Sequence, residues 1–406
     1  MTTNPIAAMK GELTSIQRWE STIRALVDWD PPGAFNRLKQ SVDGMLGGWS
    51  VGIKDIIDVQ GMTTRCNVDF LPVDPAPKNA AVVETLINLG AFVLAKTVTT
   101  SFAFLDPGVT RNPWNSNHTP GGSSSGSAAA VASGMVRLAL GSQTVASVNR
   151  PASYCGVVGF KPTFGRLSTA GIFPFAPSVD TVGFFTRGVS DMQTAGSALF
   201  REPVGSLAMP MRIGLVKNLQ TTSAEEEMLK VLESSGKRLA AAGFSVYPIT
   251  LPVESAEAYG HHFSLIAAEA AQVHEKLFPQ HAQRYPPKLR ELLVEGKRVT
   301  SEKLNQIQAH RGALRQSIGG LFEDVDVMLS PSAAGPAPEG LSGTGDPRFS
   351  LIWTYTGCPT LTLPVTLSRN ALPIGLQLVG PPMKDMSLLS AARAIESILP
   401  FRSRPG

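Results

Sequence analysis

The chain has 406 residues, of which 43% are hydrophobic and 17% are charged, and its formal net charge is +4. This composition is typical of a folded globular protein with one large domain or two coupled domains. The net charge is mild and no block of lysine or arginine occurs, so the sequence predicts no nucleic-acid partner.

The first part of the chain predicts helices followed by alternating strands and helices. Residues 1–50 are polar and predict one or two helices that wrap the core. Residues 51–59 (VGIKDIIDV) predict a buried strand that ends in a turn. Residues 79–89 carry apolar side chains at helical spacing, and residues 92–95 predict the next strand. This alternation predicts a sheet with helices on its faces.

The middle of the chain is dominated by small residues. Residues 106–127 are rich in glycine, proline and serine and predict a loop. Residues 127–135 predict a helix that packs very close to a neighbour. Residues 136–200 alternate short apolar runs with glycine and proline, which is typical of central strands and turns.

The last part of the chain predicts several helices and then a return to strands. Residues 224–319 are rich in Glu, Lys, Gln, Leu and Ala, and helical periodicity returns there. Strands are expected at residues 324–329, 360–365 and 374–379, and a final helix at 386–398. The returning strands indicate that the helical segment is an insertion and not an independent domain.

We therefore predict a single domain over residues 1–406. Its class is α/β, with a mixed, mainly parallel central sheet covered by helices on both faces and a helical insertion. Its parts are N-terminal helices (1–50), a catalytic core (49–200), a helical substrate-pocket insertion (224–319), and returning core strands with a final helix (321–398).

Cysteine and histidine patterns predict neither disulfides nor a bound metal. Cys66, Cys155 and Cys358 are far apart and show no CxxC spacing, which fits a reducing compartment. The histidines include no HExxH pair, so we expect no metal and no cofactor. The N-terminus lacks the pattern of a signal peptide and no apolar run reaches the length of a membrane helix. We therefore expect a cytoplasmic protein without a membrane partner.

Lys54 lies in an apolar run, which is consistent with a buried lysine. A serine hydroxyl needs a base to act as a nucleophile, and lysine can serve only when burial keeps it neutral. The alternative is a lysine at a strand end, with its ammonium in solvent or paired with Asp55. Local sequence alone favours that alternative, because buried lysines are rare.

Ser123 lies in residues 121–127 (GGSSSGS). Such a run can be a flexible linker, a phosphate-binding loop, or a tight loop whose glycines let a serine approach another segment. The apolar helix that follows at once weakens the first interpretation. The lack of a lysine after the glycines weakens the second.

Ser147 follows Ser123 by 24 positions, within residues 141–151 (GSQTVASVNRP). Consecutive backbone N–H groups in such a turn can converge on an oxyanion, and losing one such donor costs about 3 kcal/mol of barrier stabilisation. Taken in isolation, the segment would be interpreted as a buried turn.

Together these segments resemble the amidase signature family. That family shows a GGSSGGS-type loop, a nucleophile 24 residues after its first serine, and then a stretch that residues 151–163 (PASYCGVVGFKPT) match. Further similarity lies in residues 111–115 (RNPWN), 180–183 (DTVG), 357–359 (GCP) and 372–377 (LPIGLQ). The sequence of residues 151–156 is most similar to that of the shorter, indole-acetamide-hydrolase-like members of the family.

The resemblance implies a Ser-Ser-Lys catalytic triad. Ser147 would be the nucleophile, Ser123 the bridging serine, held by a cis peptide bond, and Lys54 the base. It also implies an oxyanion hole formed by the backbone N–H groups of four residues: Thr144, Val145, Ala146 and Ser147. For substrate binding we expect Gly122, Phe173 and Trp353, which suggests an apolar or aromatic acyl group.

Two departures from the family pattern surround Ser147. Gln143 and Asn149 replace an acidic and a basic residue that typically form an ion pair. We expect an amide–amide hydrogen bond between them, because changing both partners avoids a stranded buried charge. Val145 and Ala146 replace two glycines, so either the turn needs no positive φ or the oxyanion hole is altered.

The expected function is amidase activity: cleavage of the C–N bond of a small carboxamide to carboxylate and ammonia through a Ser147 acyl-enzyme. One alternative is an amidase-type subunit of a glutamine-dependent tRNA amidotransferase, which would need partner subunits. Another is a catalytically silent amidase-like binding protein. The expected partner is a small-molecule amide, and a homodimer is left open.

Overall fold

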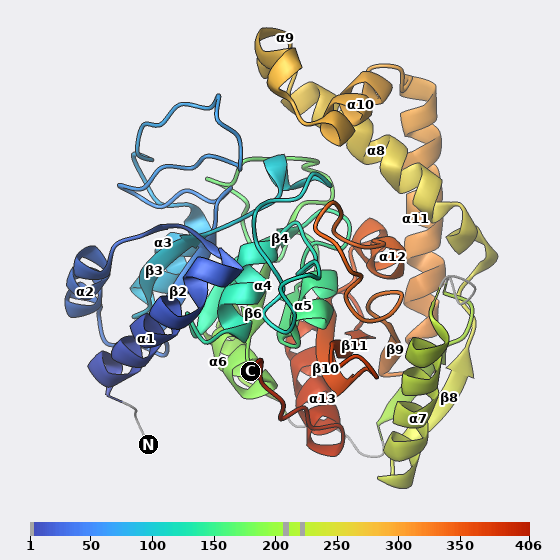
Figure 1. Cartoon of the computed structure of the whole chain (residues 1–406). Helices are drawn as coiled ribbons and strands as arrows, with labels where there is room; N and C mark the ends of the chain where they lie inside the picture. Colours follow the sequence, from blue (N-terminus) through green and yellow to red (C-terminus); the bar gives the residue numbers. More distant parts are fainter. Residues whose placement is uncertain (1–3, 206–210, 220–223) are drawn as a thin grey trace.

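The computed structural model describes residues 4–205, 211–219 and 224–406. Eleven strands within these residues form one sheet (Figure 1). They are β1 (Leu26–Trp29), β2 (Ser50–Lys54), β3 (Phe92–Thr97), β4 (Leu138–Gln143), β5 (Val158–Lys161), β6 (Thr181–Thr186), β7 (Arg212–Val216), β8 (Ser245–Ile249), β9 (Val327–Pro331), β10 (Thr360–Leu367) and β11 (Pro373–Val379). Their spatial order is β1-β3-β2-β4-β6-β5-β10-β11-β9-β7-β8. Strands from both ends of the chain therefore share this sheet.

The mixed sheet of an α/β protein is confirmed, but the expectation that it is mainly parallel was wrong. Six of the ten neighbouring pairs in the described part of the chain are antiparallel, including every pair from β4 to β9. Parallel pairs lie only between β3, β2 and β4 and between β9, β7 and β8. The central strands are buried on both faces, so their continuous apolar runs look like those of parallel strands, and the pattern does not encode direction.

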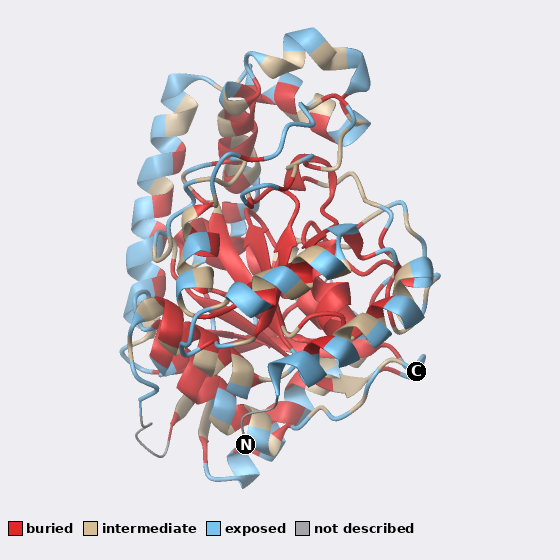
Figure 2. Ribbon diagram, turned by 90° about the vertical axis from the view of Figure 1, so that its left-hand side faces the viewer, coloured by how far each residue is buried: buried red, intermediate tan, exposed pale blue. Residues whose placement is uncertain are grey.

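Two apolar cores flank the sheet, as the alternation along a single strand shows. In β4, Leu138 and Leu140 belong to one core and Ala139 to the other. The smaller core takes in α1 (Pro5–Ile23), α2 (Pro31–Gln40), α4 (Ser125–Ala132) and α5 (Asn149–Cys155). The larger one takes in α3 (Ala81–Asn88), α6 (Val189–Phe200), α7 (Glu226–Ala241) and α13 (Asp385–Ile398). Figure 2 shows the resulting burial of the central strands.

The helical insertion lies between β8 and β9. It consists of α8 (Ala258–Val273), α9 (Leu277–His281), α10 (Pro287–Gly296) and α11 (Ser301–Leu321). In Figure 1, α9 and α10 lie above the sheet, and α11 runs down beside it on the right. α8 contacts α10, α11 and α12 (Arg348–Thr356), and every residue of α12 after Arg348 is buried. The insertion is shorter than the expected 224–319, because α7 packs on the sheet and β8 is its edge strand.

β1 is one of three described strands, together with β7 and β8, that the sequence did not indicate. It pairs antiparallel with β3 at the sheet edge, and only its first residue is buried. Four residues with one buried side chain give too little alternation to be recognised. None of the described helices is long and apolar enough to cross a membrane.

Candidate active site

Lys54 is the last residue of β2 and its side chain is completely buried. Its Nζ donates hydrogen bonds to Ser123 Oγ at 2.7 Å and to Ser142 Oγ at 2.8 Å. Burial lowers the pKa of Lys54 to about 7, although the nearby Asp180 opposes the shift. Asp55 does not pair with Lys54, because its carboxylate lies 3.1 Å from Lys96 Nζ. The interpretation of Lys54 as a buried lysine is therefore the correct one.

The serine loop packs directly on β4, as expected for the third interpretation of its glycines. Ser124 Oγ donates to the Ser142 carbonyl at 3.2 Å, and Ser127 Oγ donates to the Leu140 carbonyl at 2.8 Å. A Cβ on Gly141 would lie 2.7 Å from Ser124 Oγ, so this contact requires glycine. The peptide bond between Gly122 and Ser123 is cis.

Ser147 lies in the turn between β4 and α5, next to the serine loop. The Ser124 backbone N–H donates to the Ser147 carbonyl at 3.4 Å, and the Ser147 side chain is buried. The structure thus brings Ser147 beside Ser123, although no hydrogen bond joins their hydroxyls within the described residues. The backbone N–H groups of residues 144–147 have no acceptor among the described residues. Buried N–H groups are rarely left without a partner, so this turn is a candidate site for a negatively charged oxygen.

Side chains from two distant helices hold the carbonyl groups of this turn. His262 of α8 donates from Nε2 to the Thr144 carbonyl at 2.8 Å. Burial lowers the pKa of His262 to about 3, so the ring is neutral near pH 7. Thr354 of α12 donates to the Val145 carbonyl at 2.8 Å. The insertion and α12 therefore fix the direction of two consecutive peptide groups.

The expected amide–amide hydrogen bond between Gln143 and Asn149 is not formed. Gln143 Oε1 instead accepts from the backbone N–H groups of Val148 and Asn149, at 2.8 and 3.0 Å. The Asn149 side chain bonds Thr360 and Thr362 of β10. The contact is therefore side chain to backbone, because the turn brings the start of α5, and not the Asn149 side chain, to Gln143.

The structure shows how the turn before Ser147 accommodates Val145 and Ala146 in place of the two glycines of the family. Neither of them has a positive φ, so the turn needs no glycine at these positions. Both side chains are buried, at 7% and 1% exposure. The turn accommodates the two larger residues without left-handed backbone geometry.

Arg150 ties the serine loop to residues 344–345. The guanidinium is buried and donates to the carbonyls of Gly122 and Gly345, at 2.7 and 2.6 Å, and to Thr344 Oγ1 at 2.9 Å. Burial lowers the pKa of Arg150 to about 10. Gly122, expected to contact substrate, is thus packed against this segment, where a Cβ would lie 2.8 Å from Thr344 Cγ2.

A cavity of about 530 Å³ opens beside Ser142 and Thr144. Phe173 lines it, which agrees with the expectation for this residue. Trp353 does not line it. Its side chain is 0% exposed and its neighbours in α12, residues 349–356, are all buried, so it is a core residue and the expectation for it was wrong.

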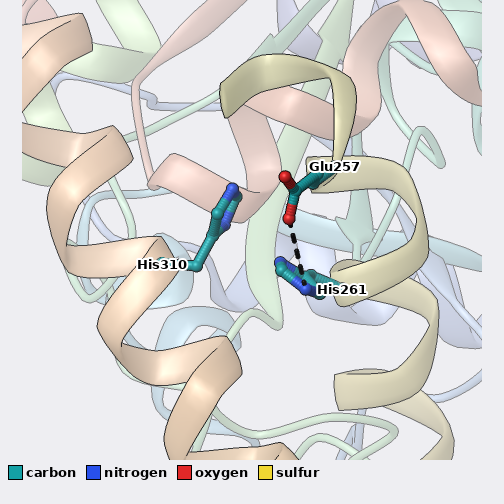
Figure 3. A group of neighbouring side chains, drawn as sticks. All are labelled: Glu257, His261 and His310. Carbon is teal, nitrogen blue, oxygen red and sulfur yellow. Dashed lines mark ion pairs between the residues drawn. The ribbon is translucent and has the colours of Figure 1, made fainter. Parts of the chain in front are cut away.

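One group of side chains in the described part of the chain could hold a metal ion: Glu257, His261 and His310 (Figure 3). Their ligand atoms lie within 4.8 Å of one another. His310 already uses both ring nitrogens, Nδ1 with Tyr355 Oη at 3.1 Å and Nε2 with the Glu254 carbonyl at 3.0 Å. In this arrangement the group connects α8 with α11.

Sequence reasoning missed several residues that shape the site. Ser142 and Asp180 stood inside recognised segments, but no role followed from their type. Asp180 accepts from Thr144 Oγ1 at 2.6 Å. His262 and Thr354 carry no sequence signal, because each is distant along the chain and reaches a backbone carbonyl.

Comparison with known proteins identifies the class. Residues 16–389 match the family model named Amidase. A 2-amino-5-chloromuconic acid deaminase of Comamonas testosteroni is 32% identical over 94% of this chain and 90% of its own length. A glutamyl-tRNA(Gln) amidotransferase subunit from Alkaliphilus metalliredigens (strain QYMF) is 31% identical over 88% of this chain and 84% of its own length. A crystal structure of an amidase, 30% identical, covers 98% of this chain and 96% of its own with a TM-score of 0.90.

The chain belongs to the amidase family. The resemblance seen in its motifs is confirmed, and so is the fold. Its class of chemistry is hydrolysis of the C–N bonds of amides. The relatives include both a deaminase and amidotransferase subunits, so the particular reaction of this chain is a separate question.

Proposed function

We propose that this protein hydrolyses a small carboxamide to carboxylate and ammonia through an acyl-enzyme on Ser147. The observation that carries the proposal is the environment of Lys54. A completely buried lysine with a pKa of about 7 can be neutral in solution near physiological pH, and its Nζ lies 2.7 Å from Ser123 Oγ. A neutral amine in contact with a serine hydroxyl is a general base.

The proposed reaction begins when Ser147 Oγ attacks the amide carbonyl carbon. The Ser147 proton passes to Ser123, whose own proton passes to Lys54, so Ser123 acts as a bridge. The carbonyl oxygen becomes an oxyanion, and its proposed donors are the N–H groups of residues 144–147, which have no acceptor in the described part of the chain. This arrangement supplies both a base and an electrostatic stabiliser without a cofactor.

The second half of the cycle returns the proton. Protonated Lys54 gives its proton back through Ser123 to the leaving nitrogen, which departs as ammonia when the C–N bond breaks. Water then attacks the Ser147 ester with Lys54 again as base, which releases the carboxylate and restores the serine. Each proton that Lys54 takes up is returned within the same half-reaction.

The test is ammonia release by the purified protein over a panel of amides. Ser147→Ala should reduce turnover by at least about 1000-fold, because removing a covalent nucleophile leaves only the residual catalysis of the site. Ser133→Ala is a matched control, since Ser133 is a buried serine whose Oγ has no hydrogen-bond partner among the described residues. Equal turnover by Ser147→Ala and wild type would contradict the assignment.

A second candidate function is that of an amidase-type subunit in a tRNA-dependent amidotransferase. The similarity to the Alkaliphilus protein favours it. Under this function, ammonia release should need partner subunits, whereas a stand-alone amidase turns over by itself. A protein that binds amides and never releases ammonia, with or without partners, would instead be a silent family member.

A further inference from the structure

The cavity beside the Lys54 network is walled mainly by apolar side chains. Most of the wall comes from residues 168–177, which run from β5 toward β6. The apolar lining residues that matter here are Ile56, Ala103, Ile172, Phe173, Phe175 and Val182. The cavity meets the site through Ser142, which bonds Lys54, and Thr144, which begins the turn before Ser147. An acyl group bound in the cavity would therefore extend from the reacting carbonyl.

Among the described residues that line the cavity, the only ionisable one is acidic. Asp180 lines it, and no lysine, arginine or histidine is among the described lining residues. The Asp180 carboxylate accepts from Thr144 Oγ1 at 2.6 Å and from the N–H groups of Phe175 and Ala176 at 2.8 and 3.0 Å. These three donors are therefore already bonded to Asp180 and are not available to a substrate anion.

The described residues that line this cavity would not stabilise a carboxylate on the substrate. A buried anion needs a cation or several N–H donors to replace its lost hydration. An aromatic or aliphatic group has no such requirement, and a volume of about 530 Å³ lies within the range of cavities that enclose small ligands.

We propose that the substrate is an uncharged carboxamide with an apolar acyl group, and that amides bearing a carboxylate, glutamine included, are discriminated against. This inference rests on the proposed function, because it names the substrate class of the same site. The lining residues decide the discrimination, and the catalytic groups decide only whether the amide is cleaved.

The first experiment compares phenylacetamide with 4-carboxyphenylacetamide, which differs from it by one carboxylate on the ring. Their dissociation constants are measured calorimetrically with the Ser147→Ala protein, and kcat/KM with the wild type. We expect both measurements to favour phenylacetamide by about 100-fold, as for a hydrophobic pocket that meets one added polar group. Equal values, or a preference for the carboxylated amide or for glutamine, would overturn the inference.

The second experiment adds the missing cation. Ala170 is exposed and lines the cavity, and only its backbone makes hydrogen bonds, so larger side chains can be introduced there. Ala170→Arg should reduce the preference for phenylacetamide by about tenfold, because a guanidinium can pair with the carboxylate. Ala170→Met, of similar length and uncharged, should leave the preference unchanged. An unchanged preference in the arginine variant would count against the cavity as the acyl site.

The two proposals fail in different ways. If the wild type releases ammonia from carboxylated amides as readily as from neutral ones, the substrate class is wrong and the amidase function stands. If no amide is cleaved while the Ser147→Ala protein still prefers phenylacetamide, the function is wrong and the character of the cavity stands. If neither amide binds, the cavity is not the acyl site.

Discussion

Protonation of Lys54 sets the pH range in which the proposed reaction can run. The base must be neutral, and its pKa of about 7 means that the neutral fraction falls tenfold for each pH unit below 7. We expect kcat/KM to rise with a slope near one up to about pH 7 and then to level off. A pH–rate profile from 5.5 to 9 checks this, since kcat/KM reports ionisation of the free enzyme. A flat profile would exclude Lys54 as the base.

In the proposed reaction His262 would act only through the turn, as a positioning residue, because its one hydrogen bond in the described residues goes to the Thr144 carbonyl. His262→Phe removes the donor to the Thr144 carbonyl and keeps an aromatic ring of similar size. We expect kcat to fall about tenfold with little change in KM, because the turn serves the transition state more than the bound substrate. His262→Gln can still donate and should recover part of the loss. If the phenylalanine variant has the same kcat as the wild type, the hydrogen bond from His262 to the Thr144 carbonyl does not contribute to catalysis.

At the scale of elements, the approach of α4 to β3 depends on small residues. A Cβ on Gly126 would lie 2.3 Å from the Ala25 carbonyl oxygen and 2.4 Å from the Val98 nitrogen, both backbone atoms. Gly126→Ala should therefore lower the free energy of unfolding by about 1–3 kcal/mol or more, as overpacking does. Displacement of α4 should also move Ser123 and reduce turnover.

The matched control is the same substitution in the exposed helix α11. A Cβ on Gly312 meets no atom within 4 Å. Gly312→Ala should raise the free energy of unfolding by about 0.5–1 kcal/mol, since alanine restricts the unfolded chain and favours helix. Urea denaturation of the two variants gives both values. Two changes of the same sign would contradict the packing argument.

The sequence predicted elements best where burial and period agree. Ala81–Asn88, Phe92–Thr97 and Asp385–Ile398 were expected within a few residues. The proposed triad residues were predicted from the spacing and flanking residues of a family pattern, and the structure places Lys54 Nζ in contact with Ser123 Oγ. The direction of the central strands and the roles of His262 and Thr354 were not predictable, because they depend on which distant segments meet in space.

At the scale of the whole molecule, buried histidines should make the protein sensitive to acid. Burial lowers the pKa of His262 to about 3 and that of His274 to about 4, whereas an unfolded chain binds the proton near 6.5. Between pH 6.5 and about 4 the unfolded state therefore carries more protons, and stability falls as pH falls. The loss should be roughly 1 kcal/mol per histidine for each pH unit.

Denaturant midpoints measured between pH 7.5 and 4.5 test this sensitivity. The slope of stability against pH should become smaller in His262→Gln, which has no group to protonate at that position. The same slope in the variant and the wild type would show that His262 does not contribute. The paired carboxylates titrate in both proteins, so the difference between the two curves isolates the histidine.

The hydrogen bonds around Ser147 have a further consequence for the conditions under which the turn keeps its shape. The uncharged side chains of Gln143, Thr354 and His262 bond backbone groups in and beside this turn, where the family typically has an ion pair. Dissolved salt screens the attraction between exposed charges, but it has little effect on hydrogen bonds between buried neutral groups. The turn should therefore be equally well ordered at high and at low salt concentration. Ionic strength should affect this protein mainly through the charged groups on its surface.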